Sequence, residues 1–134
     1  MTIQLSVAAR NAGLDSFETA AGATAKLQIR TGAQPANCAA AASGTLLAEL
    51  TLPSDWMAAA SGGTKALAGS WTGSGVAAGI AAHFRIVDNA GTTCHMQGSV
   101  SATGGGGDMT LDNTSIAVAQ AVQITGFTLT GGNP

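Results

Sequence analysis

The sequence has little charge. Asp, Glu, Lys and Arg make up 9% of its 134 residues, against about 25% in typical soluble domains. With five Lys and Arg residues and a net charge of −2 at pH 7, it lacks the basic surface with which proteins bind nucleic acids or anionic lipids. The composition therefore predicts no nucleic-acid partner and no membrane partner.

Long apolar runs are also missing. No stretch approaches the roughly 18 consecutive apolar residues of a membrane-spanning helix. Residues 1–10 lack the basic start and apolar centre of a secretory signal, so we expect no signal peptide.

Small residues take the place of charged ones: 28 Ala, 19 Gly, 16 Thr and 10 Ser fill 73 of the 134 positions. Such short side chains lose little rotamer entropy when a partner immobilises them, which favours a component of a larger assembly. A small neutral domain fits the composition equally well. The apolar content of 46% argues against disorder, and the length suits one domain over residues 1–134.

Residues 6–21 are predicted to form a helix. Its apolar residues recur near the helical period, at Val7, Leu14, Phe17 and Ala21. Asp15 and Glu18 fall on the other side, and Gly22 fits the position where a helix stops.

From about residue 24 to residue 130 the pattern changes to that of strands. Leu27 and Ile29 alternate with polar neighbours, which is typical of a half-buried strand. In residues 46–52 the apolar side chains at even positions are expected to share one face, and Pro53 ends the strand.

The clearest hairpin pairs residues 82–87 with residues 94–100 across an Asp-Asn-Ala-Gly turn. A short strand begins at Met109. In residues 122–129 the apolar phase slips at Gly126, which predicts a glycine β-bulge. One helix followed by seven or eight short strands indicates a mainly β fold, a single antiparallel β-sandwich of jelly-roll-like type with a short N-terminal helix.

Two glycine-rich segments resemble ligand motifs only in their letters. Residues 73–78 match G-x-G-x-x-A, but the next predicted strand leaves no room for the helix that dinucleotide binding requires. Residues 103–110 come within one residue of a calcium-binding nonapeptide, which works only in stacked copies. We therefore predict no cofactor and no metal ion.

Candidate catalytic side chains are scattered. Cys94 and His95 are adjacent on a strand and so point to opposite faces. We interpret Cys94 and Cys38 as buried free thiols, with a Cys38–Cys94 disulfide as the alternative. The carboxylates are expected to serve turns and solvation: Asp15, Glu18, Glu49, Asp55, Asp88, Asp108 and Asp112. No enzyme is predicted; an activity that depends on His95, Cys94 or Asp108 would revive that reading.

The two tryptophans stand out among few aromatic residues, since aromatics form 4% of the chain. Trp56, its neighbour Met57 and Trp71 lie in a loop-like middle region, where aromatic side chains can anchor a protein interface. The alternative is that one or both tryptophans close the end of the sandwich core.

Several short blocks, taken in order, resemble a family of small structural proteins of tailed bacteriophages and prophages. They are VAARNA (7–12), LQIRTG (27–32), QPAN (34–37), TLLAEL (45–50), ASGG (60–63), AHFRI (82–86), GSV (98–100), MTLDNTSI (109–116) and ITGFTL (124–129). They span nearly the whole chain, and none is a catalytic signature. The chain departs from the family's pattern at residues 53–57 and at Cys38.

The resemblance implies a virion component without enzymatic activity, with the head as the expected location. There the chain would be a capsid cement or decoration protein that binds and bridges major capsid subunits on the outer surface. A homo-oligomer, dimer or trimer, is the default expectation. Assembly in the bacterial cytosol would keep both cysteines reduced.

Two other functions remain open on the sequence. One is a neck or tail adaptor of the same virion. The other is a carbohydrate- or receptor-binding module in which Trp56 and Trp71 form the stacking platforms.

Overall fold

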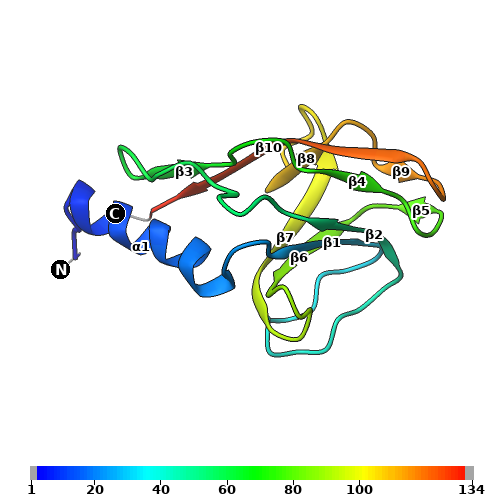
Figure 1. The fold of residues 1–134 in the computed structure, drawn as a ribbon, viewed down its shortest axis with the longest axis horizontal. Helices are drawn as coiled ribbons and strands as arrows, with labels where there is room; N and C mark the ends of the chain where they lie inside the picture. Colours follow the sequence, from blue (N-terminus) through cyan, green and yellow to red (C-terminus); the bar gives the residue numbers. More distant parts are fainter. Residues whose placement is uncertain (1–2, 132–134) are drawn as a thin grey trace.

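The computed structural model describes residues 3–131, which form one helix and ten strands (Figure 1). The helix is α1 (Val7–Ala21). The strands are β1 (Lys26–Arg30), β2 (Leu46–Thr51), β3 (Thr64–Ala66), β4 (Thr72–Ser74), β5 (Gly79–Ile80), β6 (His83–Val87), β7 (Cys94–Ala102), β8 (Met109–Leu111), β9 (Ser115–Ile116) and β10 (Ala121–Thr130). The prediction of a mainly β chain with an N-terminal helix is confirmed.

Eight strands form one curled sheet. Its order is β2-β1-β6-β7-β8-β10-β3, and β4 also pairs with β10; β5 and β9 form a separate small ladder. The sheet folds over until β4 meets β2, where Ala48 bridges Gly75 and the Val76 N–H donates to Leu47 O (2.7 Å). The curled sheet thus encloses its apolar face as a β-sandwich does.

One strand pair departs from the antiparallel prediction. β7 and β8 run parallel, with Val100 opposite Met109. The Gly-rich loop of residues 103–108 between them is long enough to return the chain before β8 begins. All other paired strands are antiparallel in the part of the chain that the structure describes.

Local sequence signals explain where the elements begin and end. Ser6 is the N-cap of α1, and its hydroxyl oxygen accepts from the Ala9 N–H (3.1 Å). Gly22 ends the helix at φ +86°, a conformation that favours glycine. The predicted hairpin is β6–β7. The pairing of β10 with β8 shifts register between Ile124 and Gly126, as the predicted bulge requires.

The core lies inside the curl of the sheet and is organised around four aromatic rings. Trp56, Trp71, Phe127 and Phe84 contact one another in that order, with ring centroids 5.5–5.8 Å apart. Leu47 also lies in the core, although the alternation in residues 46–52 predicted it to face outward. The curl explains this, because β4 and the segment after it cover β2 where a flat sheet would leave it open.

Candidate functional site

The predicted interface anchors are buried. Trp56, Met57 and Trp71 are each 0–1% exposed. The indole Nε1–H of Trp56 donates to Gly22 O (3.1 Å), and that of Trp71 to Trp56 O (3.0 Å), so their polar atoms are also satisfied within the chain. The prediction that these side chains anchor a partner is wrong, because the segment that contains them closes the end of the core.

The cysteine prediction is also wrong. Cys38 and Cys94 form a disulfide, with their Cα atoms 5.2 Å apart. The sequence places the two residues 56 positions apart, and only the path of the loop between β1 and β2 across the sheet brings them together.

The turn role expected for the carboxylates is found for some of them and not for others. Asp88 does accept from the Thr92 and Thr93 amides, whereas Asp15 and Glu18 have a different role.

Chemically active groups are not gathered in one place. Within residues 3–131, no group of three or more His, Cys, Asp and Glu side chains could hold a metal ion. Asp108 accepts from the backbone N–H and the hydroxyl of Ser99 (2.9 and 3.0 Å), so this carboxylate joins β7 to the loop before β8. Gly73 lies in β4, and β5 follows at Gly79 without an intervening helix, so the dinucleotide-motif geometry is absent there.

Helix α1 is attached to the sheet through its polar face. Lys65 of β3 is 2% exposed, and its Nζ contacts Asp15 Oδ1 (2.6 Å) and Glu18 Oε1 (3.2 Å). The Lys65 ammonium also donates to Ala58 O (3.0 Å). A buried charge is stable only with such partners, so this cluster fixes the helix on the strand.

The same helical face caps the backbone beside β3. The Met57, Ala60 and Gly63 N–H groups donate to side chains of the helix, namely Glu18 Oε2 (3.0 Å), Asp15 Oδ1 (3.0 Å) and Asn11 Oδ1 (2.9 Å). These three acceptors are spaced four and three residues apart, so they form one row on α1. The row satisfies amides that an edge segment would otherwise leave without partners.

The titration of this cluster follows from its hydrogen bonds. The Lys65 hydrogen bond, the Ala60 N–H and the Lys65 charge hold the pKa of Asp15 below its ordinary value of 3.8, against a smaller opposing effect of burial. Burial alone would lower the pKa of Lys65, but its hydrogen bonds to Asp15 and Glu18 raise it above 10.5. Asp15 and Lys65 are therefore both charged at neutral pH.

Because the polar row of α1 faces the sheet, apolar side chains of α1 and of the segment before it remain in solvent. Of the apolar residues that recur along the helix, Leu14 and Ala21 are buried, but Phe17 is 42% exposed and Val7 47%. Ile3 and Leu5 of the preceding segment are also exposed. A groove of about 250 Å³ lies here, lined by Leu5, Ala9, Arg10, Gly13, Leu14, Phe17, Thr130 and Gly131. We call this surface the helical end.

A second exposed apolar cluster lies at the other end of the molecule. Val76, Ile80 and Val118 are 58–66% exposed, in and beside the β5–β9 ladder. Figure 1 shows this ladder and α1 at opposite ends of the longest axis. We call this surface the strand end. All exposed large apolar side chains of residues 3–131 belong to these two ends.

Comparison with known proteins gives no relative: no family model, curated protein or solved structure matches the chain. In the described part of the chain, no helix has the length and apolar character needed to cross a bilayer.

Sequence reasoning missed the polar docking of α1. The signal was present, because Lys65 is the one Lys or Arg between residues 31 and 84 and it lies in a stretch of Gly, Ser and Ala. Such an isolated cation needs acidic partners if it is buried. Asp15 and Glu18, three residues apart on a helix, could have been recognised as those partners.

Proposed function

We propose that the chain is a non-enzymatic structural protein of a bacteriophage particle, which decorates the capsid by binding and bridging major capsid subunits. The observation that supports this most is the separation of exposed apolar side chains into two ends of an elongated molecule. A protein with two such ends can contact two neighbouring subunits at once. Exposed apolar clusters on soluble proteins commonly mark protein-binding surfaces.

The surface between the two ends suits the same role. Only 9% of the sequence is charged, so few ions must be desolvated when the protein lies on a lattice. Many weak contacts repeated around a shell add up through multivalency. The block-by-block resemblance to phage structural proteins points in the same direction, and a homo-oligomer on the lattice remains part of the proposal.

The disulfide is compatible with a location on the outside of released particles. Thiols in the bacterial cytosol are kept reduced, whereas disulfides persist outside the cell. Under this proposal Cys38 and Cys94 are thiols during assembly, and after release an extracellular oxidant such as dissolved oxygen takes two electrons and two protons from them as the disulfide forms.

The carbohydrate-binding alternative loses its basis. Trp56 and Trp71, the expected stacking platforms, contact each other and other core residues and offer no ring face to solvent. Stacking of a sugar requires an accessible face, so we do not propose this function.

Quantitative mass spectrometry of purified particles tests the proposal, with heads and tails separated and the major capsid protein as internal standard. We expect the chain in the head fraction, in simple numerical proportion to capsid subunits. A few copies in the neck or tail fraction would replace the decoration role with an adaptor role. Absence from both fractions would contradict a virion function.

A further inference from the structure

The loop of residues 31–45 covers the outer face of the sheet. It leaves β1, passes over β6 and β7, and returns to β2 (Figure 1). The Cys38–Cys94 disulfide attaches it to β7, and the Gln97 side-chain amide donates to Pro35 O (2.8 Å). Because of this cover, β6 is buried on both faces.

Arg85 lies under this loop. It is 5% exposed, and its Nη2 donates to the carbonyl oxygens of Asn37 (3.2 Å), Cys38 (3.4 Å) and Ala40 (2.8 Å). Its Nε donates to Gln97 Oε1 (3.1 Å). Among the described residues the Arg85 Nη1 donates no hydrogen bond. The buried polar atoms without a partner are Arg10 Nε and His83 Nε2, so Nη1 is not fully buried. Nη1 therefore reaches accessible space.

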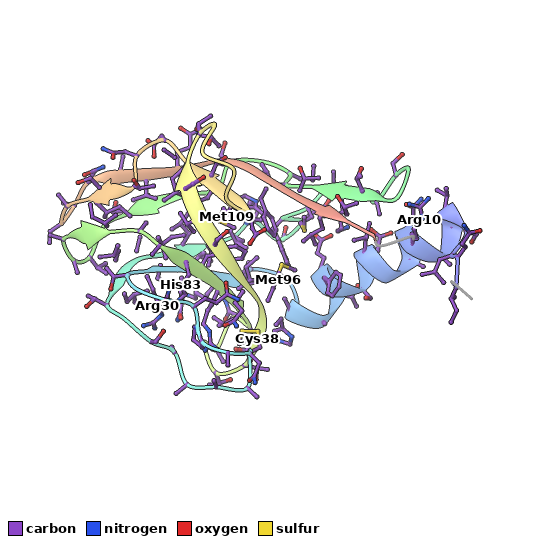
Figure 2. All side chains as sticks on the ribbon, turned by 180° about the vertical axis from the view of Figure 1, so that it is seen from behind. Arg10, Arg30, Cys38, His83, Met96 and Met109 are labelled. Carbon is purple, nitrogen blue, oxygen red and sulfur yellow. A yellow bond between two sulfur atoms is a disulfide. The ribbon has the colours of Figure 1, made fainter. Side chains whose placement is uncertain are left out.

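A second guanidinium lies on the same face of the sheet. Gln28 pairs with Arg85 across β1 and β6, and Arg30 is two residues further along β1. The Arg30 Nε and Nη2 donate to Gln28 Oε1 (3.3 and 3.2 Å). Figure 2 shows Arg30, His83 and Cys38 on the side of the molecule that the loop covers.

Neither guanidinium has an acidic partner. In residues 3–131 the Lys65 pairs are the ion pairs within 4.0 Å, so no carboxylate lies at that distance from Arg30 or Arg85. Burial lowers the pKa of Arg30, and the charge of Arg85 lowers it further, while Glu49 acts in the opposite direction. Glu49 contacts Gln28 instead (3.0 Å). Two like charges thus lie in a partly dehydrated site without a direct counter-charge, an unfavourable arrangement.

A cavity of about 300 Å³ adjoins both side chains. Its lining includes Gln28, Arg30 and Arg85 of the sheet, both cysteines of the disulfide, and Ala40 of the covering loop. Its volume admits one small ion with water molecules. The disulfide forms part of its wall, so the loop and the two arginines make one site.

We propose that this cavity binds a small inorganic oxyanion, phosphate or sulfate, between the guanidinium groups of Arg30 and Arg85. Guanidinium donors suit oxyanions because several N–H groups can point to the oxygens of one ion. The bound anion supplies the missing counter-charge and strengthens the attachment of the loop. This inference is independent of the proposed virion function.

Isothermal titration calorimetry with the full chain tests the proposal, with sodium phosphate and sodium sulfate each compared against sodium chloride at equal ionic strength. We expect saturable one-to-one binding of phosphate and sulfate, and none of chloride. The Nε–Hε resonance of Arg85 in ¹H–¹⁵N spectra should shift along the same binding curve. Heats and shifts that do not saturate, or that chloride reproduces, would overturn the proposal.

Arg30→Gln is the diagnostic variant, because the Arg30 side chain makes one long hydrogen bond to the loop, from Nη1 to Gly44 O (3.4 Å), whereas Arg85 donates to three loop carbonyls. We expect about tenfold weaker binding, from the loss of one charged hydrogen-bonding group. Lys26→Gln is the matched control, since Lys26 lies on the same strand and face but does not line the cavity. Equal losses in the two variants would show only general attraction to positive charge and would contradict the site. Arg85→Gln also removes the loop contacts, so it serves only as a supporting variant.

Discussion

Large apolar side chains occupy two different surroundings in this protein. Those in the middle of the chain, Trp56 and Trp71 above all, are sealed inside the curled sheet. Those at the helical end and the strand end, such as Phe17 and Val118, lie in solvent. The difference separates residues that stabilise the fold from residues available to a partner, and it reverses the expectation that the tryptophans would bind the partner.

Truncation of the aromatic core should give the largest effect on stability. Trp71→Ala removes an indole that contacts both Trp56 and Phe127, and we expect a loss of about 3–5 kcal/mol in the free energy of unfolding. Urea unfolding followed by circular dichroism measures it. The control is Val118→Ala, at a side chain that is 66% exposed, with an expected change within about 0.5 kcal/mol. Similar losses in both variants would erase the distinction between core and ends.

Removal of the disulfide should have the next largest effect. Cys38→Ser combined with Cys94→Ser opens a link between residues 56 positions apart, and links of this kind contribute about 2–4 kcal/mol. Chemical denaturation of the double variant gives the value. Hydrogen exchange should locate the loosened amides in the loop of residues 31–45 and in β6, while α1 stays protected. Faster exchange spread evenly over the chain would contradict a local attachment.

The attachment of α1 to β3 depends on polar contacts rather than on apolar packing. Lys65→Met removes the ammonium that joins Asp15 and Glu18 to β3, and we expect a loss of about 1–3 kcal/mol. Amide exchange should accelerate in α1 and in residues 57–65 more than in β1 and β6. Lys26→Met is the control, since Lys26 forms no ion pair within the described residues. Unchanged exchange in α1 would show that other contacts fix the helix.

Acid should weaken the attachment of α1 to β3 before it affects the core. Lys65 holds the folded-state pKa of Asp15 below 3.8, so its contribution is complete above the unfolded-state pKa and is lost as pH falls through the lower folded value. Protection of α1 amides, measured as pH is lowered through this range, should decrease while tryptophan fluorescence stays native. Asp15→Asn should be less stable at pH 7 and should lose this part of the pH dependence.

A second carboxylate provides the comparison for that experiment. The Thr92 and Thr93 amides also lower the pKa of Asp88. The stabilisation that the ionised Asp88 gives to the folded state is therefore also lost as pH falls. Asp88→Asn should change the acid response of the β6–β7 turn and leave that of α1 intact. A response of α1 to Asp88→Asn would contradict the assignment to Asp15.

The sequence predicted the elements well where the pattern was local. The helix that ends at Gly22, the β6–β7 hairpin and the bulge at Gly126 each depend on a few neighbouring residues. The parallel β7–β8 pair and the contact of β4 with β2 were missed because they depend on how far the whole sheet curls. The alternation of apolar and polar side chains in residues 46–52 and 94–111 does not show how strongly the sheet curls.

The candidate site was harder to predict for the same reason. Whether a tryptophan in a Gly- and Ala-rich segment is buried depends on where that segment lies after folding, and here it closes the sheet. The apolar stripe of α1 could not show which face of the helix packs on the sheet, because only Leu14 and Ala21 of that stripe are buried. One buried lysine on a distant strand instead holds the polar row inward.

Co-sedimentation with capsids that lack this protein tests most directly whether an exposed end binds the lattice. The variant is Phe17→Asp, at the helical end. Ala12→Asp is its control, also exposed on α1 and about 140° away around the helix. We predict that Phe17→Asp stays folded and loses capsid binding, while Ala12→Asp binds like the original chain. Undiminished binding of Phe17→Asp, or equal loss in both variants, would contradict the role assigned to the helical end.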